Sequence, residues 1–171
     1  MMKNFAMQRN LKVINTFLLL MMILLISNQG LAQENKIYNY KTILEKSSNE
    51  NRNSISMQSL VADLHTSISL ENGKVEKFGD GDVVALDTDI SSLSKITNLS
   101  NQFVGFQIIK IHFKTNSELN SKLDLSQLKN FSKLRFVYLM CPFETNQSQI
   151  NSFFTGSNEA ITIIYTAALP K

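Results

Sequence analysis

The stretch of residues 125–141 (LSQLKNFSKLRFVYLMC) constrains the fold of this chain more than any other. Apolar side chains recur at every third position from Leu125 to Val137, and then at every second position up to Cys141. A three-residue interval is typical of a helix or of tight turns, and a two-residue interval is typical of a strand with one buried face. The stretch therefore predicts a helical segment followed directly by a strand.

The same succession of helical and extended patterns recurs along the C-terminal two thirds of the chain. Strand-like runs occupy residues 83–87, 106–113, 134–141 and 160–167. The segments 90–99, 125–131 and 147–154 between them have helical patterns, and each follows a residue suited to a helix N-cap. Strands that alternate with helices at this spacing predict a parallel sheet with right-handed crossovers.

The strand segments resemble the leucine-rich repeat family, whose strand reads LxxLxLxxN. The best fit is Leu134-x-x-Val137-x-Leu139. The other fits are Phe106-x-x-Ile109-x-Ile111, Ile161-x-x-Ile164-x-Thr166 and Val83-x-x-Leu86-x-Thr88. The four segments start 23, 28 and 27 residues apart, and repeats of this family are roughly 20 to 29 residues long. The resemblance covers residues 83–169 and implies an α/β fold, a short leucine-rich-repeat-like solenoid with a parallel sheet.

The chain departs from this family at the turn after each strand. The family places Asn or Cys there, where the side chain satisfies backbone groups; this chain has Ser91, Lys114, Pro142 and Leu169. Those backbone groups would need other partners. The alternative is a small α/β layer fold with the same strands and helices.

Residues 1–32 have the plan of a secretory signal peptide. Residues 17–26 form an unbroken apolar run, preceded by basic residues without acids and followed by small residues before Gln33. The run is short for a transmembrane helix, which needs roughly 20 apolar residues; an uncleaved N-terminal anchor is the alternative. We therefore expect an exported protein, periplasmic or extracellular.

The charge of the expected mature chain argues against a polyanionic partner. All 14 acidic residues follow residue 32, whereas three of the 17 basic residues precede it, so 14 of each remain and the formal charge is zero. We therefore predict no nucleic-acid partner and no membrane contact beyond the signal peptide.

The mature chain divides into two expected parts. Residues 33–56 are predicted to be a flexible segment with one short helix over 37–44, and the polar run 46–56 reads as a linker. Residues 57–171 are predicted to be a single repeat-like domain. It would begin with a helix whose apolar face is Met57, Leu60, Val61 and Leu64, and with a hairpin over 67–78 around Asn72-Gly73. The helix and hairpin would cap the repeats.

If the repeat register holds, side chains between the core positions project from the opposite face of the sheet. These candidate binding residues are Lys110, His112, Phe136, Tyr138 and Tyr165. Aromatic and charged groups together are typical of a protein-binding surface. The alternative is that residues 33–78 cover this face, because its first column is apolar: Ala85, Ile108, Phe136 and Ile163.

Residues that could carry catalysis are few. Cys141 is the only cysteine and continues an apolar alternation, which favours a buried side chain; pairing with His112 as a nucleophile is the alternative. The acids Asp80, Asp82, Asp87 and Asp89 lack the spacing of a calcium loop, and neither histidine has a ligand at metal spacing. We predict no metal and no cofactor.

These observations favour an exported, non-catalytic interaction module of leucine-rich-repeat type that binds a protein or a glycan. An envelope hydrolase or transferase with a site of another pattern is the alternative, as is a purely structural accessory domain.

Overall fold

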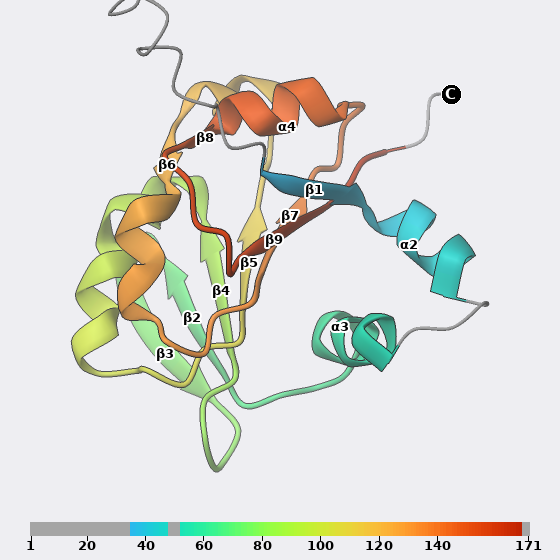
Figure 1. The fold of residues 1–171 in the computed structure, drawn as a ribbon. Coiled ribbons are helices and arrows are strands. Elements are labelled where there is room, and N and C mark those ends of the chain that lie inside the picture. Colours follow the sequence, from blue (N-terminus) through green and yellow to red (C-terminus); the bar gives the residue numbers. More distant parts are fainter. Residues whose placement is uncertain (1–34, 48–51, 169–171) are drawn as a thin grey trace, which may run out of the picture. The chain divides into compact units, whose positions relative to one another are not determined.

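A seven-stranded sheet is the framework of the part of the chain that the computed structural model describes, residues 35–47 and 52–168. The predicted signal peptide, residues 1–32, lies outside these ranges. The strands are β1 (Lys36–Asn39), β2 (Ser67–Glu71), β3 (Lys74–Phe78), β4 (Ala85–Asp89), β5 (Ile108–His112), β7 (Phe136–Met140) and β9 (Thr162–Thr166). Their order is β1-β9-β7-β5-β4-β2-β3 (Figure 1). All neighbours are parallel except β2 and β3, so the predicted mixed α/β class with a parallel sheet is confirmed.

The four predicted strands lie side by side in chain order, as β4, β5, β7 and β9. The predicted hairpin β2–β3 is also present and forms one edge. Its turn residues Asn72 and Gly73 have φ angles of 49° and 75°, which Asn and Gly tolerate better than other residues do. The other edge is β1, which the sequence did not predict as a strand.

Helical segments follow most of the strands. They are α2 (Tyr40–Ser47), α3 (Arg52–Ala62), η1 (Ile90–Asn101), η2 (Asn116–Asn120), η3 (Leu125–Asn130) and α4 (Gln147–Phe153). A second, two-stranded parallel sheet pairs β6 (Leu123–Asp124) with β8 (Phe154–Thr155). Segments η1 and η3 are 3₁₀ helices, which have three residues per turn, and this period matches their buried residues Leu93, Ile96, Leu99, Leu125 and Leu128.

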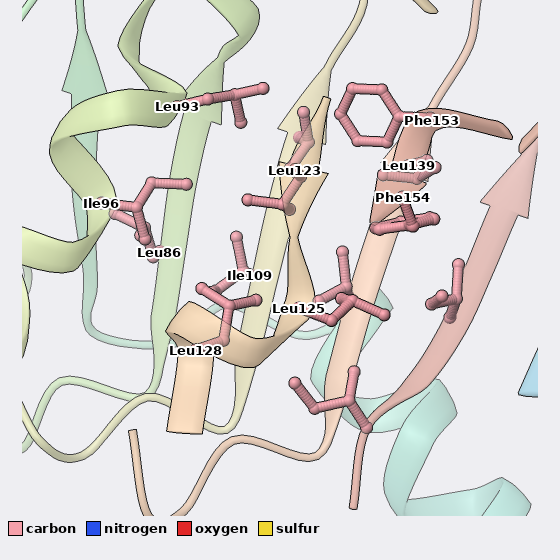
Figure 2. Close-up of a cluster of buried hydrophobic side chains, with 14 of the residues drawn as sticks. Leu86, Leu93, Ile96, Ile109, Leu123, Leu125, Leu128, Leu139, Phe153 and Phe154 are labelled. Atoms are coloured by element: carbon pink, nitrogen blue, oxygen red, sulfur yellow. The ribbon is translucent and has the colours of Figure 1, made fainter. Parts of the chain in front are cut away.

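The main core lies between the seven-stranded sheet and these later segments. We call this side of the sheet the core face; its central row is Leu86, Ile109, Val137 and Ile163. In Figure 2 Ile96 of η1 lies beside Leu86 of β4, and Leu128 of η3 lies beside Ile109 of β5. Leu139 of β7 lies beside Phe153 and Phe154. The opposite side, the α3 face, has the row Ala85, Ile108 and Phe136, and a second cluster packs on it.

The N-terminal segment differs from its predicted structure. Residues 36–39 form strand β1 and α2 begins at Tyr40, where a helix over 37–44 was expected. Helix α3 begins at Arg52, so part of the predicted linker 46–56 is helical. Met57 and Leu60 are buried as expected, but Leu64 lies beyond the helix and is fully exposed.

The register of the last strand was predicted wrongly by one residue. Val137 pairs with Ile163, so Ile163 and Tyr165 lie on the core face and Ile164 lies on the α3 face. The run Ile161–Tyr165 is almost entirely apolar, so its pattern allows either register. Hydrogen bonds from Ile161 N to Asn158 O and from Thr162 N to Arg135 O accompany the observed register.

No helix within the described ranges is long and apolar enough to span a lipid bilayer.

Candidate functional site

The α3 face is closed where the parallel strands begin. Ala85, Ile108 and Phe136 lie next to one another on β4, β5 and β7, and Phe136, the most accessible of them, is 7% exposed. Met57 and Leu60 of α3 belong to the same buried cluster. Figure 1 shows α2 and α3 on the side of the sheet opposite to the segments that follow β4 and β6. This part of the predicted binding surface is therefore buried between α3 and the sheet.

The next row toward the strand ends changes from polar to aromatic across the sheet. Asp87, Lys110 and Tyr138 are register partners on β4, β5 and β7. Tyr138 is 6% exposed, and its ring lies 5.8 Å from the ring of Tyr40 in α2. Burial raises the pKa of Tyr138, because the charged phenolate would be poorly solvated there. Tyr138 is therefore a neutral, covered residue.

Lys110 supports the helix that covers this face. Its Nζ donates to the carbonyl oxygen of Val61 at 3.4 Å. Val61 is next to the last residue of α3, where helix carbonyls lack intrahelical partners and the helix dipole favours a positive charge. The ammonium group thus ties the end of α3 to β5.

His112 of β5 and Asp87 of β4 lie within reach of each other's side chains. Nε2 of His112 lies 3.4 Å from Oδ1 of Asp87, and the two side chains are 44% and 29% exposed. The register partner of Asp87 is Lys110, and His112 lies two residues further along β5. Because alternate residues of a strand point to the same side, Asp87 and His112 are on the same face. Asp87, His112 and the Lys110 ammonium together form a polar cluster toward the carboxyl ends of β4 and β5. We call this cluster the polar end.

Asp89 marks the margin of the polar end. It precedes η1, and Ser91 Oγ donates to its Oδ2 at 2.8 Å, whereas its Oδ1 has no hydrogen-bond partner among the described residues. Burial works to raise the pKa of Asp89, but the polar groups of Ser92, Ser91 and Asn72 outweigh burial and lower it. Asp89 is therefore ionised at neutral pH.

Cys141 does not belong to the polar end. It is 4% exposed in the main core, on the opposite side of the sheet from His112. Burial raises the pKa of its thiol to about 12. A neutral thiol separated from His112 by the sheet cannot serve as its nucleophile, so the alternative Cys141–His112 pairing is wrong.

The five predicted binding residues are thus separated by the fold. Lys110 and His112 lie together at the polar end, Phe136 and Tyr138 are covered by α2 and α3, and Tyr165 lies in the main core at 7% exposure. Asp87 was missed as the partner of His112. The repeat register placed Asp87 on the same face as His112. The contact between them also requires β4 and β5 to be neighbouring strands, which the register alone does not state.

The described residues include no group of three or more His, Cys, Asp or Glu side chains that could hold a metal ion. Comparison of the chain with protein-family models, with curated proteins and with solved structures finds no match.

Proposed function

We propose that this protein is an exported, non-catalytic interaction module of leucine-rich-repeat type, and that it binds a protein or a glycan through the polar end. The binding groups are Lys110, His112 and Asp87. The predicted aromatic contribution from Phe136, Tyr138 and Tyr165 is left out, since each of these side chains is less than a tenth exposed.

The proposal of a degenerate repeat is supported by chain order. Strands β4, β5, β7 and β9 join one parallel sheet consecutively, and 3₁₀ segments η1 and η3 pack on its core face. Each unit then supplies one strand and one covering segment, as repeats of this kind do. In such a protein the side of the sheet away from the covering segments is the expected binding surface.

The observation that carries the proposal is the half-exposed His112–Asp87 pair on a face that is otherwise covered. The carboxylate accepts hydrogen bonds, the ammonium donates them, and the imidazole does either. Hydroxyl groups of a sugar and amide groups of a peptide both suit such a set. The carboxyl ends of parallel strands are also where ligands most often bind in open α/β sheets.

The test is binding to glycan and peptide arrays by the wild-type chain and by His112→Ala and Asp87→Asn. We expect both substitutions to weaken the wild-type signals by roughly tenfold, which corresponds to about 1.4 kcal/mol. Lys77→Ala, on β3, is the matched control and should bind normally. Equal binding by all four proteins, or no ligand for any of them, would contradict the proposal.

A hydrolase or transferase is the second candidate, because the same pair has the arrangement of a general base and its orienting carboxylate. It requires a nucleophile other than Cys141, or an activated water. Turnover of ester or glycoside substrates that disappears in His112→Ala but persists in Cys141→Ser would favour this candidate over the binding module.

A further inference from the structure

Strand β3 has an open edge that carries unused polar groups. It pairs with β2 alone, and all five of its residues are exposed. Lys74 pairs with Glu71 beside the two-residue turn, and the residues that flank such a turn form a hydrogen-bonded pair. Because these pairs alternate along the ladder, Lys74 and Glu76 turn their backbone groups to β2, and Val75 and Lys77 turn theirs to the open edge.

From this edge we infer that two copies of the chain associate through β3, in antiparallel fashion, about a two-fold axis that passes between the two Val75 residues. This inference goes beyond the proposed ligand binding, which uses other residues. The register follows from parity and charge. With a two-fold axis normal to the sheet, residues that lie opposite each other must have their side chains on the same face. The axis therefore passes through a residue position and not between two, and the central positions of β3 are Val75, Glu76 and Lys77.

Charge selects one of these three registers. An axis through Glu76 places two carboxylates opposite each other, and an axis through Lys77 does the same with two ammonium groups. An axis through Val75 pairs Lys74 with Glu76 of the second copy, twice, and leaves no like charges opposite each other. Opposite charges in such cross-strand pairs stabilise a sheet, and like charges destabilise it.

Two further observations support the register through Val75. The Glu76 side chain makes no hydrogen bond or ion pair with another described residue, and its neighbour on β2 is Ser69, so its carboxylate is available. Val75 is 46% exposed, and the dimer places it against its own copy. Val75 also turns its N–H and C=O outward, so the two copies exchange a pair of hydrogen bonds at the axis.

The contact is small, so the dimer is weak. Stable interfaces bury roughly 1,200 Å² or more, and a few paired residues on each strand bury much less. We expect a dissociation constant between about 10 μM and 1 mM, rising with salt because the charge pairs are exposed.

The experiment is sedimentation equilibrium of the chain produced from its full sequence, at low salt and up to about 1 mM. The weight-average mass should rise from monomer toward dimer with concentration. Lys74→Glu and Glu76→Lys should each remain monomeric, because each places like charges in opposition. Their equimolar mixture should dimerise, since every pair is then opposite in charge. Lys77→Glu, with the same charge change as Lys74→Glu, should associate like the wild type.

Three results would overturn the inference: a wild type that stays monomeric throughout, a mixture that stays monomeric, or a loss of association in Lys77→Glu. Circular dichroism checks that the variants fold. Amide hydrogen exchange in the wild type is an independent measurement, in which the Val75 N–H should become more protected as concentration rises. Exchange that is the same at all concentrations would also exclude the dimer.

Discussion

The two faces of the central sheet are built from the same strands but are closed in different ways. The core face is covered by segments that follow the strands in order. On β4, β5, β7 and β9 it is apolar except for Thr88, whose hydroxyl donates to Leu70 O at 2.9 Å. The α3 face is covered by two helices, α2 and α3, from the N-terminal part of the chain. The beginnings of its strands are apolar, whereas the later parts of β4 and β5 carry the polar end. The core face, with a covering segment after most of its strands, is thus buried more completely than the α3 face, where two helices leave part of the sheet available.

The core face should tolerate a charge least. Val137 is completely buried in the middle of it, so Val137→Asp would place an unpaired carboxyl group in the main core. We expect the free energy of unfolding to fall by about 4 kcal/mol or more. Urea denaturation measures this change. Lys133→Asp, at an exposed turn, is the control and should alter stability by less than about 0.5 kcal/mol; similar values for the two would refute the assignment of the core.

Ile109 and Ile108 compare the two faces directly, since they are adjacent in β5, point to opposite sides and are both completely buried. Replacing either by Ala should cost about 3 kcal/mol in urea denaturation, from lost burial and the cavity that remains. If α3 covered its face only loosely, Ile108→Ala would cost far less than Ile109→Ala. A cost for Ile108→Ala below about 1 kcal/mol would therefore mean that the α3 face is open.

Cys141 tests how dry the core face is. Because burial raises the pKa of its thiol from 9.0 to about 12, the thiol contributes stability that is complete below pH 9 and is lost as pH rises toward 12. Wild type should therefore lose more stability than Cys141→Ala between these pH values. At pH 8 a thiol reagent should label the folded chain at least about 100-fold more slowly than the urea-unfolded chain. Equal labelling rates would show that the core face admits solvent.

Asp89, at the margin of the polar end, should make the free energy of unfolding depend on pH in the acidic range. Its folded-state pKa lies below the ordinary value of 3.8, so its contribution is complete above that pH and is lost as pH falls through the lower folded-state value. Asp89→Asn should be less stable than wild type by about 1 kcal/mol at pH 6, and the gap should close toward pH 2. Thermal melts at several pH values measure it. A gap that widens on acidification would reverse the sign and contradict the structure.

The polar end should be the region where substitution matters least for folding. The His112–Asp87 pair is partly exposed, and such pairs contribute little to stability. We expect His112→Ala to change the free energy of unfolding by less than about 0.5 kcal/mol in urea denaturation. A loss above about 2 kcal/mol would show that His112 is a structural residue rather than one free to bind a ligand.

Sequence patterns predicted the parallel strands well, because alternation in β4 and β5 distinguishes two faces. They failed in β9, where consecutive apolar residues satisfy both faces. They also missed β1, a four-residue strand whose partner lies at the far end of the chain. Lys110 and His112 were placed on the correct face by parity alone. Which helix covers Phe136 and Tyr138 depends on packing between distant segments, and no local pattern reports it.

The pairing of β1 with β9 has a consequence for biosynthesis. The first described strand finds its only neighbour in the last, with Lys36 beside Thr162. A growing polypeptide cannot form this edge until residues 162–166 have left the ribosome, and closing so long a loop slows folding. Strand β1 therefore waits without a partner while more than a hundred residues are synthesised, and a deletion confined to β9 would release β1 as well.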